Sequence, residues 1–214
     1  KNGLSEQGSS FVTPVAAPGT RLFIAGLLSS SAKTTSVMRF LVPGNLSATV
    51  HLSVFSNGGV FTPVGFDSLT IANQRVIDVA LPRLALSAPF GIEVSSDQPI
   101  FAATLSKRSV GRVDLAWANQ LTPLSTFKVN LAGASAQFLF MGKSILVRAE
   151  WSDVKGKSIV ATITGESSAL FHPTGPLNGI TFTLLGSEVI YGGVIVTNID
   201  GGVNYLPLLA NHQI

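Results

Sequence analysis

One segment has the spacing of a catalytic motif without the context that its chemistry needs. Ser125-Thr126-Phe127-Lys128 spells the Ser-x-x-Lys motif of penicillin-recognising serine enzymes, in which both side chains share one face of a helix. Here Val129-Asn130-Leu131 continues an alternating pattern, which predicts a strand and points Ser125 and Lys128 to opposite faces. The motif therefore predicts no serine nucleophile.

The spacing of the other ionisable residues supports neither metal binding nor acid–base catalysis. His51, His172 and His212 are far apart, and a zinc site takes three or four converging ligands. Glu150 and Asp153 are close in sequence but need not converge as the paired carboxylates of a glycosidase must. The chain has no cysteine, which excludes disulfides and cysteine nucleophiles. We therefore expect a protein that is not an enzyme and holds no metal or cofactor.

The remaining candidate is a short run of positive charge followed by an aromatic residue. Lys107, Arg108 and Arg112 lie at the predicted tip of a hairpin, and Trp117 follows them. Cations there suit an anionic polymer, and a surface tryptophan suits the apolar face of a sugar ring. A solvated loop and a buried tryptophan are the structural alternatives. These four residues are the predicted ligand-binding residues.

The composition is that of a folded β protein. Of the 214 residues, 46% are hydrophobic and only 12% are charged, which argues against disorder. The net charge is +3 with basic residues mostly scattered singly, so nucleic acid is not an expected partner. No apolar run approaches the roughly 20 residues of a membrane helix. Residues 1–19 read as a flexible leader, and we expect a signal or anchor upstream of Lys1 to have been removed.

The stretch from Phe40 to Phe55 carries the clearest structural pattern. From Ala48 to Val54, apolar and polar residues alternate, which is the period of a half-buried strand. Pro43-Gly44 suits a turn that reverses the chain, so the stretch predicts a hairpin. A second hairpin is predicted from Phe90–Val94 and Ile100–Leu105, which flank Ser95-Ser96-Asp97-Gln98-Pro99.

The second half of the sequence follows the order of the first. Three pairs of segments match: Phe40–Gly44 with Phe138–Gly142, Ser47–Phe55 with Ser144–Trp151, and Gly91–Ser96 with Gly193–Asn198. Each half holds roughly seven strands with frequent turn signals, which is the spacing of a sandwich. We predict an all-β protein of two tandem antiparallel β-sandwich modules with an Ig-like, Greek-key arrangement. The modules span residues 20–122 and 123–214 and are related by an internal repeat.

Three motifs in the first half carry a resemblance to a known family. They are Phe40-Leu41-Val42-Pro43-Gly44, Val94-Ser95-Ser96-Asp97-Gln98-Pro99-Ile100 and Asp114-Leu115-Ala116-Trp117. Over residues 20–120 the chain resembles an uncharacterised family of exported actinobacterial β-sandwich proteins. The resemblance implies a secreted or cell-envelope location and supplies no catalytic residues. The second half departs from it, because Met141-Gly142 stands in place of Pro43-Gly44.

These observations favour a non-enzymatic, exported protein of the cell envelope with a structural or interaction role. Its expected partner is an anionic wall polymer or an envelope protein, contacted through Lys107, Arg108, Arg112 and Trp117. A carbohydrate-binding module, an enzyme acting on envelope glycans, and a capsid or appendage subunit are the alternatives. A glycan-stacking Trp117 or Trp151 would identify the first, and a pocket with converging carboxylates the second.

Overall fold

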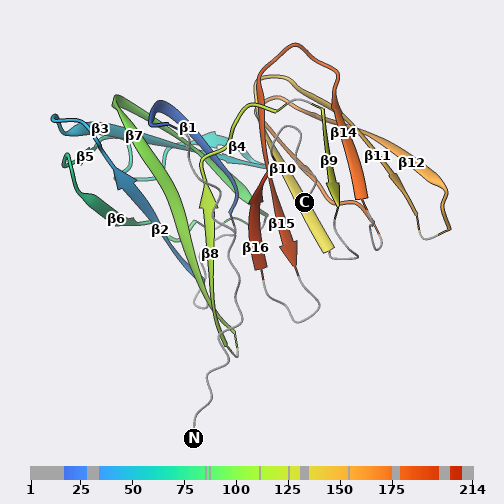
Figure 1. Ribbon diagram of the computed structural model, residues 1–214, viewed down its shortest axis with the longest axis horizontal. Coiled ribbons are helices and arrows are strands. Elements are labelled where there is room, and N and C mark those ends of the chain that lie inside the picture. The colour runs from blue at the N-terminus through green and yellow to red at the C-terminus, as the bar shows by residue number, and fades with distance from the viewer. Residues whose placement is uncertain are drawn as a thin grey trace, which may run out of the picture.

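The computed structural model describes residues 17–27, 34–84, 86, 88–110, 112–124, 126–130, 135–153, 155–174, 179–197 and 203–208 (Figure 1). Over these residues the protein is all-β, as predicted, and its paired strands run antiparallel. None of the described segments forms a helix with the length and apolarity that crossing a membrane requires. The predicted leader lies outside the described residues except for 17–19.

The first eight strands form one sheet. They are β1 (Gly19–Leu27), β2 (Thr34–Leu41), β3 (Ala48–Ser56), β4 (Gly59–Phe61), β5 (Leu69–Ile71), β6 (Val76–Ala80), β7 (Phe90–Val110) and β8 (Arg112–Asn119). The main path through the sheet is β4-β3-β7-β2-β6, and β1 and β8 also pair with β7. Strand β7 is therefore the shared neighbour of β1, β2, β3 and β8.

The hairpin predicted around Ser95–Pro99 is wrong, because β7 runs without a break from Phe90 to Val110. Its first part pairs with β1 and β3. From Phe101 it pairs with β2, and from Ala103 also with β8. Proline at position 99 has no N–H to donate, and the Asp97 carboxylate accepts the N–H of Thr49 at 2.7 Å. The residues with turn character thus mark where one strand exchanges its neighbours.

The hairpin predicted around Pro43-Gly44 is also wrong in its pairing. The strand pattern itself is confirmed, since β2 and β3 cover the predicted segments. However, β2 pairs with β6 and β7, whereas β3 pairs with β4, β5 and β7. The loop carries the chain across to the other side of the apolar core, and the buried Val42 accepts the N–H of Gln74 through its carbonyl at 2.8 Å.

The later strands form two four-stranded sheets. They are β9 (Phe127–Asn130), β10 (Ser135–Gly142), β11 (Ile145–Ser152), β12 (Ser158–Gly165), β13 (Ser168–Phe171), β14 (Gly179–Leu184), β15 (Ile190–Thr197) and β16 (Val203–Pro207). One sheet has the order β13-β10-β15-β16 and the other β12-β11-β14-β9. The link from β10 to β11 crosses from one of these two sheets to the other. In contrast, β15 and β16 form a hairpin where the first half has the continuous β7.

Three apolar clusters hold these sheets together. The first fills the space between the two parts of the eight-stranded sheet, with Phe40, Leu52 and Ile92 fully buried. The second lies between the two four-stranded sheets and centres on Phe182. Burying each such side chain stabilises the fold by about 1.5–3 kcal/mol.

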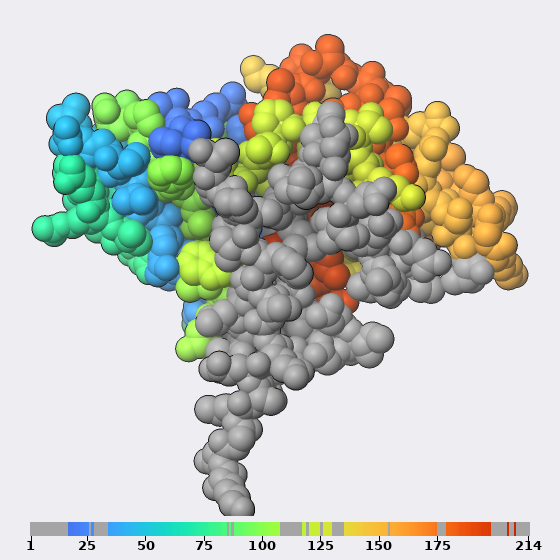
Figure 2. All heavy atoms as spheres, viewed as in Figure 1, coloured from blue at the N-terminus to red at the C-terminus, as the bar shows by residue number. Residues whose placement is uncertain are grey.

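The third cluster joins the two halves of the chain and consists of Phe23, Ala25, Phe55, Leu121, Leu139 and Met141. We call it the junction cluster. Strand alternation explains it, because Leu22 and Ile24 point into the first cluster while Phe23 and Ala25 point the opposite way. In Figure 2 the blue-to-green residues of the first half and the orange-to-red residues of the second lie on opposite sides of this junction. The predicted module boundaries and the internal repeat stay predictions.

Candidate functional site

The predicted basic residues lie near the end of the β7–β8 hairpin. The two strands pair from Ala103 opposite Asn119 to Val110 opposite Arg112, so the predicted hairpin is present. Lys107 is exposed on β7, beside Thr35 of β2 and Leu115 of β8. Arg108 and Arg112 belong to the same strands, and their side chains lie outside the described part. Their role in ligand binding stays a prediction.

Trp117 is half-buried and contacts an ion pair on the outer face of the sheet. The guanidinium of Arg39 lies 5.0 Å from the centre of the Trp117 ring, a cation–π distance. Arg39 also donates two hydrogen bonds of 2.7 Å to the carboxylate of Asp78 on β6. The other tryptophan, Trp151, is buried in the second cluster against Phe171. Only Trp117 of the two is therefore placed to contact a partner.

The Arg39–Asp78 pair gives a pH-dependent prediction. The hydrogen bond from Arg39 lowers the pKa of Asp78 below its ordinary value, so an Arg39→Met variant should raise that pKa. A carboxyl group with a lower pKa in the folded state stabilises the fold above its unfolded pKa, and this contribution disappears as the pH falls through the folded pKa. Because the pair is exposed, Arg39→Met should lower the free energy of unfolding by less than about 1 kcal/mol at neutral pH.

NMR titration of the Asp78 carboxyl carbon between acidic and neutral pH measures both states. Lys128→Met, which removes a charge elsewhere, serves as the control and should leave the Asp78 titration unchanged. An Asp78 pKa that is the same in the wild type and in Arg39→Met would contradict the assignment.

Other residues singled out in the sequence have structural roles. Lys128 lies on β9, as the strand pattern predicted, while Ser125 lies outside the described residues. Asp153 accepts the backbone N–H groups of Lys155 and Lys157 at 2.8 and 2.9 Å and so closes a turn. His51 is exposed, and its Nδ1 contacts the carbonyl of Asp67. Among the described residues, no three histidine or acidic side chains lie close enough to hold a metal ion.

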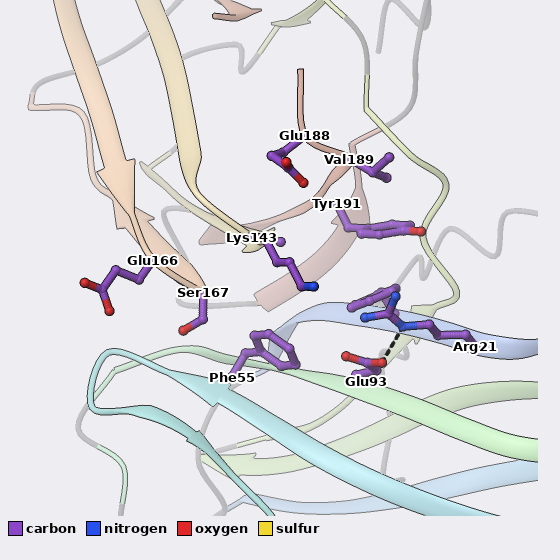
Figure 3. Close-up of a pocket in the computed structure, with 11 residues that line it drawn as sticks. Arg21, Phe55, Glu93, Lys143, Glu166, Ser167, Glu188, Val189 and Tyr191 are labelled. Atoms are coloured by element: carbon purple, nitrogen blue, oxygen red, sulfur yellow. Dashed lines mark hydrogen bonds and ion pairs between the residues drawn. The ribbon is translucent and has the colours of Figure 1, made fainter. Parts of the chain in front are cut away.

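The structure also contains a cleft at the junction of the two halves, which we call the junction cleft. Its volume is about 520 Å³, within the range of about 300–1,000 Å³ that small-molecule sites occupy. The lining residues come from separate segments of the chain: Arg21, Phe23, Phe55, Glu93, Gly142, Lys143, Glu166, Ser167, Glu188, Val189 and Tyr191. Figure 3 shows how they surround the space.

One wall of the cleft is the outer face of β1, β3 and β7. Arg21 and Phe23 lie on the face of β1 opposite to Leu22 and Ile24. Phe55 lies near the end of β3, and Glu93 lies opposite Phe23 on β7. Antiparallel register brings these side chains to one face. Alternate residues of these strands point to opposite faces of the sheet, so one set packs in the first apolar cluster and the other set forms this wall of the cleft.

The opposite wall consists of the β10–β11 link, the β12–β13 turn and the start of β15. The N–H of Gly142 donates to the carbonyl of Ser167 at 3.1 Å, and the N–H of Ser144 donates to that of Glu166 at 3.0 Å. Gly142 and Ser144 both have positive φ, at 154° and 51°, which turns the chain sharply. Lys143 lies between them and extends toward the aromatic residues (Figure 3).

Aromatic contacts and one hydrogen bond hold the walls together. Across the cleft, the rings of Phe23 and Tyr191 stack with centres 3.9 Å apart and planes 17° apart. Within the first wall, Phe55 meets Phe23 edge-on at 6.2 Å. The hydroxyl of Ser168 donates to the carbonyl of Ser56 at 2.8 Å across the junction. Such cross-wall contacts fix the geometry of the cleft before any ligand binds.

The cleft contains charges of both signs. Nε of Arg21 donates to Oε1 of Glu93 at 2.5 Å, and the two side chains are 63% and 17% exposed. This hydrogen bond raises the pKa of Arg21 above its usual range. Lys143, Glu166 and Glu188 are exposed and make no ion pair within the described part of the chain. The lining thus carries three carboxylates and two cations.

No pattern in the sequence indicates that these residues lie close together. Arg21, Phe55 and Glu93 lie within segments that read simply as strands, and Lys143 and Glu188 lie in turns of the second half. Their proximity depends on the packing of the two halves, which no local pattern specifies.

Comparisons with known proteins identify a family but no activity. The profile of a family described as "Family of unknown function (DUF5719)" matches residues 1–168. A comparison with curated proteins finds no match. Among solved structures, the apo form of a lectin from Pleurotus ostreatus is 13% identical, with a TM-score of 0.24 over 90% of this chain and 77% of that one. A similarity of that size supports no conclusion about fold or function.

Proposed function

The chain belongs to this family of unknown function, and we propose that it is a non-catalytic, exported binding protein of the cell envelope that holds its ligand in the junction cleft. The observation that carries the proposal is the lining of the cleft by aromatic rings and charged groups from separate segments. Apolar surface with a few fixed polar groups is the usual composition of a binding site. The low-charge, cysteine-free composition supports the extracytoplasmic location.

Co-sedimentation of the purified protein with isolated bacterial cell walls, across a salt series, tests this proposal. The double variant Lys143→Ala/Tyr191→Leu removes one charge and one ring from the cleft and should weaken wall binding about tenfold, the equivalent of roughly 1.4 kcal/mol. Lys155→Ala removes the same charge from an exposed turn outside the cleft and should bind as the wild type does. Equal binding by the cleft variant and the wild type, with both folded, would refute the proposal.

A contact between the β7–β8 hairpin and an anionic wall polymer is a second candidate. The exposed Lys107 and the register that brings Arg112 to the end of the hairpin favour it. Electrostatic contacts between exposed charges weaken as salt rises. A triple variant with alanine at 107, 108 and 112 should then lose the salt-sensitive part of wall binding, whereas the cleft variant should retain it.

Glycan hydrolysis is the catalytic alternative, because Glu93, Glu166 and Glu188 all line the cleft. Glycosidases use a pair of carboxyl groups on either side of the scissile bond. Release of reducing ends from cell-wall glycans by the wild type, and its loss in Glu188→Gln, would replace the non-catalytic proposal with this one.

A further inference from the structure

We infer that the ligand of the junction cleft is a neutral saccharide, an inference that rests on the proposed function of this cleft. Three features of the lining support it: the balance of charge, the pairing of hydrogen-bonding groups and the half-buried ring of Tyr191. The first of these features also discriminates against anionic ligands.

The balance of charge disfavours an anionic ligand. Glu93 is already neutralised by Arg21, which leaves the cation Lys143 against the carboxylates Glu166 and Glu188. Because Glu166 and Glu188 are exposed, their repulsion of an anionic ligand is screened by salt and is strongest at low ionic strength. Uronic acids and phosphate polymers would therefore bind here less well than their neutral counterparts.

The Arg21–Glu93 pair suits a ligand with hydroxyl groups. A guanidinium has five N–H donors and a carboxylate has two acceptor oxygens, and the pair uses one of each. Hydroxyl groups both donate and accept, so adjacent hydroxyls of one sugar can bond to both members of the pair. Because the pair as a whole is neutral, an uncharged ligand leaves its internal charge balance intact.

The aromatic residues provide the apolar part of the site. Tyr191 lines the cleft with a half-buried ring that stacks on Phe23, whereas Phe55, which also belongs to the lining, is buried. The C–H face of a pyranose ring is apolar and gains free energy when it leaves water against such rings. A rigid aromatic side chain loses little conformational entropy in this contact. The lining can therefore contact both the hydroxyl groups of a sugar, through the Arg21–Glu93 pair, and its apolar C–H face, through the aromatic ring.

Isothermal titration of the full chain with two sets of oligosaccharides tests the inference. The first set contains neutral hexose oligosaccharides, and the second contains uronic-acid oligosaccharides of the same lengths. We expect at least one neutral oligosaccharide to bind, and its uronic-acid counterpart to bind at least tenfold more weakly at low salt. Tyr191→Leu should weaken the neutral ligand about tenfold, while Lys155→Ala should leave its affinity unchanged.

A second variant covers the case in which Tyr191→Leu perturbs folding. Glu188→Ala removes the carboxylate of an exposed side chain. It should therefore reduce the difference in affinity between the neutral and the uronic-acid oligosaccharides. Equal or tighter binding of the uronic acids, or the absence of binding by every neutral oligosaccharide, would overturn the saccharide inference. If wall co-sedimentation still depends on Lys143 and Tyr191 in that case, the cleft binds another class of ligand and the proposed function stands. If it does not, both fail.

Discussion

Replacing Phe182 by alanine should lower the free energy of unfolding by about 3–5 kcal/mol, the usual cost of removing a buried phenylalanine. Phe182 is fully buried, and its ring lies 4.8 to 6.1 Å from four other aromatic rings, those of Phe127, Phe138, Phe140 and Phe171. Aromatic pairs of this kind add to the cost of the cavity, because each contributes beyond its buried area. Urea denaturation of the wild type and the variant measures the difference.

Two further variants make this prediction specific. Phe182→Leu retains much of the buried volume and should fall between the wild type and Phe182→Ala. Val160→Ala shortens a side chain that is 52% exposed, and such a surface change should stay within about 0.5 kcal/mol. A loss of less than about 1 kcal/mol in Phe182→Ala would show that the second cluster is not packed as described.

Replacing Gly193 by alanine should disturb the junction of the two halves. A Cβ atom at position 193 would lie 2.8 Å from the carbonyl oxygen of Ala25 and 3.1 Å from its Cβ. Since the nearest atom belongs to the backbone of β1, β15 must move away from it. Overpacking of this kind costs about 1–3 kcal/mol, which corresponds to several degrees in Tm for a chain of this size.

The same substitution should also weaken binding in the junction cleft, because Tyr191 on β15 and Phe23 on β1 form its aromatic contact. Thermal unfolding and wall co-sedimentation of one preparation measure both effects. Gly186→Ala is the matched control, because its nearest neighbour would be 3.9 Å away. A Gly193→Ala protein with unchanged Tm would show that β1 and β15 do not approach so closely.

Local patterns in the sequence predicted the strands but not their partners. The alternation in Ala48–Val54 and in Ser144–Trp151 corresponds to β3 and β11, because alternation follows directly from one buried face. Pro43-Gly44 and Ser95–Pro99 have the residues of tight turns, yet the first links two strands that do not pair with each other and the second lies inside β7. A turn signal reports the local backbone, whereas pairing depends on which distant strand covers the remaining apolar face.

The residues of the junction cleft could not be predicted as a group from patterns in the sequence. Arg21 and Glu93 are on neighbouring strands, but Tyr191 and Lys143 meet them only through the junction cluster. Trp117 and the basic residues Lys107, Arg108 and Arg112, in contrast, are close in sequence and belong to one hairpin, and their role in binding stays a prediction. Short-range pairs are visible in a sequence, whereas contacts between halves require the packed structure.

The central place of β7 has a consequence for the order in which the chain folds. In the described structure, β1 pairs only with β7, and β2 and β3 do not pair with each other. While a ribosome is synthesising the chain, these early strands therefore lack their main partner until residues 90–110 have emerged. Long-range pairing of this kind slows folding, and it leaves apolar strands accessible to chaperones during that interval. The strands of the first half therefore reach their final pairing only after one late strand has been synthesised.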